Sequence, residues 1–297
     1  MFFKSNADYF KEEKNTHLSD IWRIIMLKQS IDLPGIGNAR ELGGYSTGYG
    51  RIKPGLLLRT GAMNNMMPDT VNKLMNEFRL QYVIDFRMTG EQSAVPDPDI
   101  PGARNKHLSV IEIEDYPIDD PELIEVYHKC SDRMQLFEMS YQAGMLGPNQ
   151  YLFFLLGERG RKAYYDFFRI LLENDPDKGA VLWHCTDGKD RTGCAAMLLL
   201  SALGASRETI IADYMLTNEY NAGRIELIRH KTAAYRMPPD KLDALMFMSG
   251  AVVERYMTNA IDVLTEKYGS VEGYLRDELN IGNAELEELR SRYLCEA

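Results

Sequence analysis

The sequence predicts an α/β fold in which a central, mainly parallel sheet is flanked by helices. Short apolar runs rich in branched residues occur at 56–60 and 80–86, and glycine and polar residues bound them, as is usual for buried strands. Between them, the segment 68–78 opens on a proline and repeats its apolar residues at the spacing of one helix face. A strand, a helix and a second strand in that order favour a right-handed crossover between parallel strands.

Further strands and helices are expected along the rest of the chain. A third strand is expected at 107–111 and a fourth at 180–184. After residue 184 the chain is nearly all helical, beginning with an apolar helix that Gly204 closes. Later helices are expected at 206–218, 219–235, 250–267 and 283–294.

Residues 112–160 interrupt this alternation of strands and helices. They carry several prolines and two helix-like stretches, at about 121–144 and 149–157. An insertion of this size between core strands is either a lid over a site or a peripheral helical layer. We expect one domain over 1–297, which contains this insertion and has 220–297 as its helical C-terminal extension.

The composition is that of an ordinary soluble globular protein, with 45% hydrophobic and 26% charged residues among 297. The formal net charge of −10 disfavours non-specific attraction to nucleic acid or to an anionic membrane surface. An anionic substrate must therefore be met by a local positive site. The sequence leaves the oligomeric state open.

The four cysteines form no CxxC pair and no regular framework; they are Cys130, Cys185, Cys194 and Cys295. Sparse and unpatterned cysteine favours a reducing compartment, and no Cys or His pattern has the spacing of zinc ligands. The first residues hold no apolar run long enough for a signal peptide, and no run of 18 apolar residues indicates a membrane span. We therefore expect a cytoplasmic chain with no metal and no cofactor, and export without a signal peptide stays open.

The most informative segment is 180–194, which reads AVLWHCTDGKDRTGC. An apolar strand leads to Cys185, five residues follow, and Arg191 begins a helix. The backbone N–H groups between these two residues can curl around a tetrahedral dianion, and the helix N-terminus adds its own amides. Gly188 allows backbone angles closed to other residues, and Arg191 offers a planar fork for two phosphate oxygens. The segment therefore predicts a phosphate-binding loop.

The same loop predicts a reactive thiolate at Cys185. A sulfur at a helix N-terminus beside arginine and lysine is nucleophilic near neutral pH, and its attack on phosphorus would give a phosphocysteine that water hydrolyses. His184 points the other way along the strand and is expected to hold the loop by hydrogen bonding, while Thr192 is expected to donate to the sulfur. The competing interpretation is a buried and inert thiol, which is how we interpret Cys194 inside the apolar helix.

At this point the segment HCTDGKDRTG resembles the HCxxGxxR[ST]G signature of the protein tyrosine phosphatase superfamily. Its GKDRTG part is similar to that of the bacterial atypical tyrosine and lipid phosphatases. Further segments resemble other blocks of that family: NARELGGY at 38–45, GRIKPGLLLRTG at 50–61, VIDFRMTGE at 83–91 and DYMLTN at 213–218. The resemblance implies a phosphatase-like fold, with Cys185 as the nucleophile and Arg191 as the phosphate-binding arginine.

The resemblance spans roughly residues 34–220, and its blocks occur in the family's order. Ala39 stands where the family usually has Phe, and Thr60 stands where it has Ser. Residues 1–33 and 112–160 match no family block.

Three aspartates are candidates for the general acid that protonates the leaving oxygen of a phosphate ester. The WPD tripeptide typical of the superfamily is absent, which leaves Asp85, Asp187 and Asp190. Asp190 directly precedes Arg191, where a carboxyl group can face the leaving group or a water, so we favour it. Asp85 and Arg87 share one face of a strand end, where a salt bridge is slightly favoured over catalysis. Asp187 is either solvated or repels dianionic esters.

Substrate contacts are expected from the loop and from one residue before a Gly-Gly turn: Thr186, Asp187, Gly188, Lys189, Thr192 and Arg40. The loop also resembles CSDGWDR of the myotubularin lipid phosphatases. Lys189 matches the lysine that meets neighbouring ring phosphates in inositol-lipid phosphatases. A basic group later in the chain is interpreted as a solvated helix face: Arg224, Arg229, His230, Lys231 and Arg236.

We expect a metal-independent phosphomonoesterase, and we expect it to be insensitive to EDTA because the sequence shows no metal site. A protein tyrosine phosphatase is favoured, and dual specificity stays open. A phosphoinositide phosphatase is the alternative, and a non-catalytic phosphate-binding module is a remote alternative. Pseudophosphatases tend to lose the cysteine, the arginine or the acid, and all three are present. A rhodanese or arsenate reductase is disfavoured, because Cys194 lies within a helix rather than opposite the loop.

Overall fold

The structure is a computed structural model that describes residues 29–116, 118, 124–126, 129–130, 132–232 and 237–296. Part of the helix expected at 121–144, the end of the helix expected at 219–235, and Arg236 therefore lie outside the described residues.

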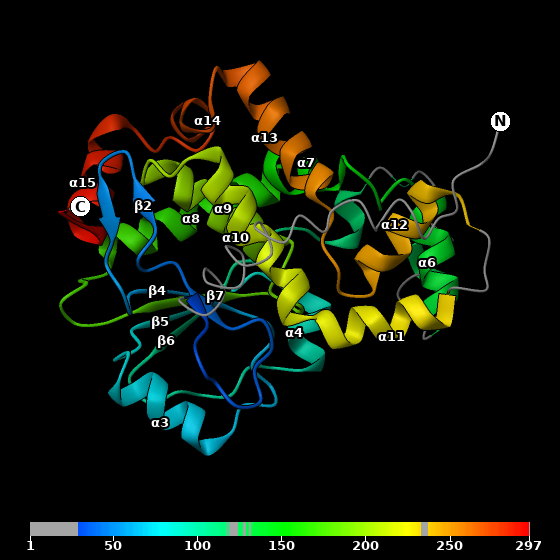
Figure 1. Ribbon diagram of the computed structural model, residues 1–297, viewed down its shortest axis with the longest axis horizontal. Coiled ribbons are helices and arrows are strands. Elements are labelled where there is room, and N and C mark those ends of the chain that lie inside the picture. Colours follow the sequence, from blue (N-terminus) through cyan, green and yellow to red (C-terminus); the bar gives the residue numbers. More distant parts are fainter. Residues whose placement is uncertain are drawn as a thin grey trace, which may run out of the picture.

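A five-stranded sheet forms the centre of the molecule (Figure 1). Its strands lie in the order β1 (Arg40–Glu41), β4 (Leu57–Thr60), β7 (Val181–His184), β5 (Tyr82–Asp85) and β6 (Arg104–His107). The last four are parallel, and β1 is antiparallel to β4. The helix expected to open at Pro68 is α3 (Pro68–Asn76), between β4 and β5. The predicted α/β fold with a mainly parallel sheet is confirmed.

Helices cover both faces of this sheet. Alternate strand residues point to opposite faces, so Leu58, Val83 and Leu182 pack with Leu74 of α3. Their neighbours along the strands form a larger core with α8 (Glu158–Glu173) and α9 (Arg191–Ala202). Figure 1 shows α3 on one side of the sheet and α8 and α9 on the other. Because both faces are buried, the inner strands β4, β5 and β7 begin with apolar residues and are buried along their whole length.

The third strand lies earlier than expected. It was predicted at 107–111, but β6 is Arg104–His107, and all four of its side chains are exposed. This strand is at the edge of the sheet, where polar side chains are tolerated and protect against further pairing. An apolar run therefore could not reveal it.

Each helix predicted after β7 has a counterpart among the described residues: α9, α10 (Arg207–Tyr220), α11 (Ala222–Thr232), α13 (Glu254–Tyr268) and α15 (Asn283–Tyr293). Gly204 lies just beyond α9 with φ of +78°, as expected for a glycine that closes a helix. Among the described residues, the helices that were not predicted are α4 (Thr89–Ala94), α8, α12 (Pro239–Met248) and α14 (Val271–Asp277). None of the helices among the described residues has the length and apolar character needed to cross a bilayer.

The insertion at 112–160 contains a 3₁₀ turn (Ile113–Asp115), α6 (Arg133–Gln142) and α7 (Gln150–Leu156). In Figure 1 α6 lies beside α12 at one end of the molecule, where Phe137, Ala244 and Leu245 form a small separate core. In contrast, α7 packs against α8, α9 and α13 in the body of the molecule. The insertion therefore contributes both a peripheral layer and a helix close to the main core.

A second, three-stranded sheet was not predicted. It consists of β2 (Ser46–Thr47), β3 (Gly50–Ile52) and β8 (Leu294–Cys295), all antiparallel. Strand β3 pairs directly with β8, so residues near the two ends of the described chain meet here.

Candidate active site

The predicted phosphate loop, residues 185–191, lies where the central strand β7 ends and α9 begins. Its cysteine, Cys185, is only 1% exposed. The carboxyl end of a parallel strand is the usual place for a ligand in an α/β sheet. Two buried aromatic side chains fix the start of α9, since Trp183 Nε1 donates to Thr192 O and Tyr164 OH donates to Arg191 O.

The loop carbonyls are turned outward. They accept hydrogen bonds from groups outside the loop: Thr186 O from Ala62 N, Asp187 O and Gly188 O from Asn38 Nδ2, and Asp190 O from Cys194 N, at 2.8–3.1 Å. In a planar trans peptide, a carbonyl and the N–H that follows it point in opposite directions. The N–H groups that follow these carbonyls therefore face the interior of the loop. None of the described residues accepts a hydrogen bond from the N–H groups of residues 186–191.

Gly188 brings the loop against strand β4. Its φ is +66°, and a Cβ added there would lie 2.3 Å from Thr60 O. No other residue fits both this backbone angle and this contact. The expectation that Gly188 permits unusual backbone angles is therefore met by the geometry.

A buried ion-pair cluster supports the loop from below. Asp213 of α10 binds Arg40 through Nε at 3.0 Å and also binds Arg59 of β4 through Nη1. Arg59 then donates from Nη2 to Gly188 O at 3.0 Å. Burial alone would raise the pKa of Asp213, but the charges of the two arginines lower it. The cluster thus holds the loop through charged and fully buried groups.

This cluster gives Arg40 a different position from the one expected. We expected Arg40 to contact the substrate phosphate, whereas it is fully buried and binds Asp213, Asn38 and Thr217. Its guanidinium therefore acts on the loop through other residues. The cluster also explains why the segments 38–45, 50–61 and 213–218 occur together, because each supplies a member of it.

Asp213→Asn is expected to lower the free energy of unfolding by about 3–5 kcal/mol, because it leaves two arginines buried without their anion. Because the pKa of Asp213 in the folded state lies below the ordinary value of 3.8, ionised Asp213 stabilises the folded state fully at a pH above 3.8. This stabilisation is lost as the pH falls below 3.8 and through the lowered pKa. Urea unfolding at pH 7 measures the loss.

The matched control for this substitution is Asp262→Asn, which breaks the exposed ion pair with Arg207. Exposed pairs contribute about 0–1 kcal/mol, so this variant should unfold close to the wild type. Equal stability of Asp213→Asn and the wild type would contradict a supporting role for the cluster.

Arg191 is held by a carboxylate that the sequence analysis did not single out. Glu91 of α4 (Thr89–Ala94) binds both terminal nitrogens of Arg191 and accepts from Thr186 Oγ1 at 2.6 Å. Burial opposes ionisation of Glu91, but the charge of Arg191 and these hydrogen bonds hold its pKa at about 2. Glu91 therefore stays ionised and fixes the plane of the guanidinium. It is the final residue of VIDFRMTGE, which was its only sequence signal.

Asp190 is oriented by groups from two other parts of the chain. Its Oδ1 accepts from Tyr151 OH at 2.8 Å, and its Oδ2 lies 3.1 Å from Lys189 Nζ. Tyr151 comes from α7, so the insertion contributes to the site, and its hydroxyl also bonds to that of Tyr214. Burial, followed by the charge of Asp190, raises the pKa of Tyr151 well above its ordinary value. The Tyr151 hydroxyl therefore keeps its proton, which it can donate to Asp190.

Lys189 also differs from the expectation. We expected it to contact substrate, but its Nζ is buried and donates to Phe247 O at 2.8 Å and to Ala251 O at 3.3 Å. The ammonium also lies 3.6 Å from the centre of the Phe247 ring. Lys189 therefore connects the loop to the end of α12 instead of reaching toward a bound phosphate.

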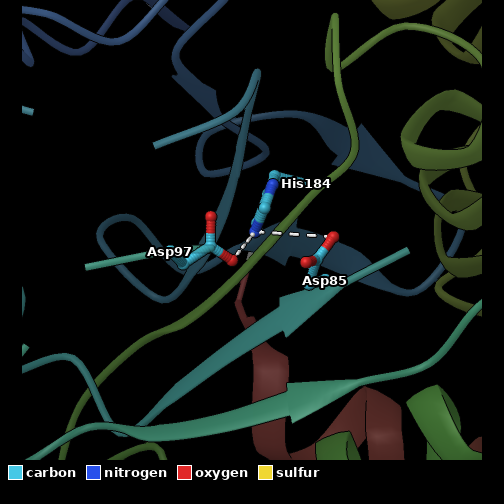
Figure 2. Close-up of side chains that lie close together, drawn as sticks. All are labelled: Asp85, Asp97 and His184. Carbon is cyan, nitrogen blue, oxygen red and sulfur yellow. Dashed lines mark hydrogen bonds and ion pairs between the residues drawn. The ribbon is translucent and has the colours of Figure 1, made fainter. Parts of the chain in front are cut away.

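His184 and Asp85 belong to a buried network beside the loop (Figure 2). His184 Nδ1 lies 3.1 Å from Cys185 O, and Nε2 lies 2.9 Å from Asp97 Oδ2. Asp85 is bound in bidentate fashion by Arg87, which also binds Asp97. The favoured interpretation of Asp85 as a salt-bridge partner agrees with this geometry, and His184 has the expected hydrogen bond to the loop.

Figure 2 also bears on metal binding, because Asp85, Asp97 and His184 present ligand atoms within 4.8 Å of one another. Both carboxylates already share the cation of Arg87 at 2.8–2.9 Å. Although burial would raise the pKa of Asp85, its hydrogen bonds to Arg87 lower it. Arg87 thus supplies the positive charge that a metal would supply, and the group is best described as an ion-pair network.

Two further loop residues have defined positions. Asp187 Oδ1 lies 3.0 Å from Arg224 Nη1 of α11, so it is ion-paired rather than simply solvated. The Thr192 hydroxyl is buried and has no hydrogen-bond partner among the described residues, and a bond to the Cys185 sulfur is therefore not formed in this state.

The charges around the loop suit a phosphate. Five cations lie in or under it (Arg40, Arg59, Lys189, Arg191 and Arg224) with four carboxylates (Glu91, Asp187, Asp190 and Asp213). These groups leave an excess of one positive charge, which balances a Cys185 thiolate, although the whole chain carries −10. Amides facing inward, a guanidinium at one end of the loop and a cysteine at its start can together bind a tetrahedral dianion and attack it.

A tyrosine phosphatase family model matches residues 31–295 of the chain. A protein of Cupriavidus necator assigned by name to the tyrosine-protein phosphatases is 30% identical over 88% of this chain and 86% of its own. The triple specificity protein phosphatase PtpB of Mycobacterium tuberculosis is 25% identical over 83% of this chain and 92% of its own. Among solved structures, PTPMT1 in complex with PI(5)P covers 69% of this chain and 95% of its own, at 14% identity and a TM-score of 0.27.

Proposed function

The chain belongs to the tyrosine phosphatase family and is a phosphatase, and we propose that it hydrolyses phosphotyrosine in proteins through Cys185. The observation that carries this assignment is the loop over Cys185, whose carbonyls bond outward and whose N–H groups face inward. Such a loop binds the three non-bridging oxygens of a phosphate ester and leaves the sulfur beneath the phosphorus atom.

The first step forms a phosphocysteine. The Cys185 sulfur attacks phosphorus, the bond from phosphorus to the ester oxygen breaks, and Asp190 gives its proton to the leaving oxygen. The loop amides and Arg191 stabilise the charge on the transferring group. Asp190 suits this role because it is partly exposed and oriented by Tyr151 and Lys189.

The second step releases phosphate. A water attacks the phosphocysteine and gives its proton to Asp190, and the sulfur leaves as a thiolate. Glu91 keeps Arg191 in one orientation throughout, since it binds both terminal nitrogens of the guanidinium. Asp85 and Arg40 are positioning residues in this scheme, because each is committed to a buried ion pair.

Protein phosphotyrosine is favoured over phosphoinositide as the substrate. The inositol-lipid interpretation depended on Lys189 facing a second ring phosphate, and that ammonium is enclosed by Phe247 and Ala251. The name of the Mycobacterium tuberculosis relative supports a specificity that extends beyond one class of phosphoester. Since the cysteine, the arginine and the aspartate are all present, a non-catalytic module is disfavoured.

We also propose that the whole chain forms one phosphatase domain, in which the insertion supplies Tyr151 and a peripheral layer of helices. The free cysteines suit a reducing compartment such as the cytoplasm, where a catalytic thiolate persists.

The test of substrate class compares kcat/KM for a phosphotyrosine peptide, a phosphoserine peptide and soluble inositol phosphates, with EDTA present throughout. We expect turnover in EDTA and a preference for the phosphotyrosine peptide of about tenfold or more, equivalent to about 1.4 kcal/mol. A higher kcat/KM for inositol phosphates would overturn the proposed substrate class.

A further inference from the structure

Arg224 differs from the other cations around the loop because its unpaired donors belong to a partly exposed side chain. Its side chain is 39% exposed, and Nη1 lies 3.0 Å from Asp187 Oδ1. Among the described residues, no acceptor bonds to its Nε or Nη2. Guanidinium nitrogens that face solvent beside a binding loop are available to an anionic ligand.

The protein backbone is shaped to hold this arginine at the loop. Gly250 has φ of +110°, and a Cβ added there would lie 3.1 Å from Cζ, Nε and Nη1 of Arg224. Asn221 and Asn218, at the end of α10, bond to Gly250 O and to the backbone of Val252. The segment 250–252 is thereby fixed to α10, and the guanidinium lies against a glycine that leaves room for it.

The remaining cations at the loop are already committed. Arg40 and Arg59 are fully buried with Asp213, and Lys189 is enclosed by backbone carbonyls. Both terminal nitrogens of Arg191 bind Glu91, and its place in the loop assigns it to the scissile phosphate. A second anionic group on the substrate would therefore meet Arg224, which comes from a different helix and lies at the rim beside Asp187.

The surroundings favour a carboxylate over a second phosphate. Asp187 takes Nη1 of Arg224, and the two donors that remain, Nε and Nη2, match the two oxygens of a planar carboxylate. The net charge of −10 also disfavours approach to an anionic bilayer, which a phosphoinositide substrate requires. A glutamate or aspartate beside a phosphotyrosine fits both conditions.

We propose that Arg224 is a specificity-determining residue that binds an acidic side chain next to the phosphotyrosine of a peptide substrate. The planar fork donates from Nε and Nη2 to the two carboxylate oxygens while Nη1 stays with Asp187. This inference rests on the proposed phosphotyrosine phosphatase activity and adds a sequence preference to it.

The test measures kcat/KM for two phosphotyrosine peptides that differ only in flanking residues, glutamate in one and glutamine in the other. A partly exposed ion pair contributes up to about 1 kcal/mol, so the wild type should prefer the glutamate peptide by about three- to fivefold. The ratio of the two kcat/KM values, glutamate peptide over glutamine peptide, should approach one in Arg224→Gln. In the wild type this ratio should fall as salt is added.

Two further variants isolate the contact. Arg229→Gln removes the same charge from the same helix, at a residue whose Nη1 binds Glu226, and should keep the wild-type ratio. Asp187→Asn combined with Arg224→Gln removes both partners, and its ratio should stay near one. If the double variant regained the wild-type ratio, the loss of preference in Arg224→Gln would have come from the unpaired Asp187. That result would overturn the inference.

The outcomes separate this inference from the proposed function. An active wild type that uses both peptides equally would overturn the role of Arg224 alone. A wild type that hydrolyses neither peptide but does hydrolyse inositol phosphates would overturn the proposed substrate class. If Arg224→Gln changed only the preference for inositol bisphosphates over monophosphates, the partner of Arg224 would be a second phosphate and not a carboxylate.

Discussion

Cys185→Ser is expected to reduce kcat for p-nitrophenyl phosphate by about 10⁴-fold or more, because a serine hydroxyl in this loop is a far weaker nucleophile than a thiolate. The loop amides and Arg191 are unchanged, so inorganic phosphate should still raise the melting temperature of the variant. Steady-state kinetics and thermal unfolding with increasing phosphate measure the two effects separately.

The control for this prediction is Cys295→Ser, which changes an exposed cysteine of β8 in the same way and should keep full activity. Turnover by Cys185→Ser at the wild-type rate would refute the nucleophile. Loss of both turnover and the effect of phosphate would indicate that the loop had collapsed, and would contradict a preformed phosphate site.

Asp190→Asn is expected to reduce kcat by about 10²–10⁴-fold for alkyl phosphates, since their leaving oxygen needs a proton. The fall should be smaller for p-nitrophenyl phosphate, because nitrophenolate leaves without protonation. Asparagine can still accept from Tyr151, but it does not neutralise Lys189, so the melting temperature of the variant must be measured as well. A series of aryl phosphates with leaving groups of increasing pKa gives the dependence directly.

Asp85→Asn is the matched comparison, because it removes a carboxylate from the buried network of Figure 2. We expect it to destabilise the protein by leaving Arg87 short of an anion, and to lower the rates for all leaving groups alike. If Asp85→Asn made the rate depend on the leaving group while Asp190→Asn did not, the general acid would be Asp85.

The centre of the fold and the loop could be predicted because their signals are local. Strand β7, Cys185 and α9 are consecutive, and an apolar run followed by glycine, lysine and arginine specifies both the strand and the anion site. The edge strand β6 could not be predicted, since its residues RNKH are exposed and carry no apolar pattern. Strands of two residues, such as β2 and β8, are too short to give any pattern.

The contact partners of the long charged side chains were the least predictable part of the site. Lys189 binds carbonyls 58 and 62 residues away, and Arg40 binds an aspartate 173 residues away. Glu91 is separated from Arg191 by 100 residues. Charged residues near a motif can bind substrate or one another, and only the tertiary contacts decide which. The motifs shared with a family indicate which residues act together, but they do not identify which residue contacts which.

The pairing of β3 with β8 has a consequence for biosynthesis. Arg51 O accepts from Cys295 Sγ across 244 residues, and Ile52 pairs with Leu294. Contacts between residues this far apart in sequence form late in folding, because the intervening chain must first be synthesised and ordered. During translation, the segment that carries Asn38 and Arg40 emerges long before its partners. The nascent polypeptide should therefore lack a supported phosphate loop until Asp213 and Phe247 have left the ribosome.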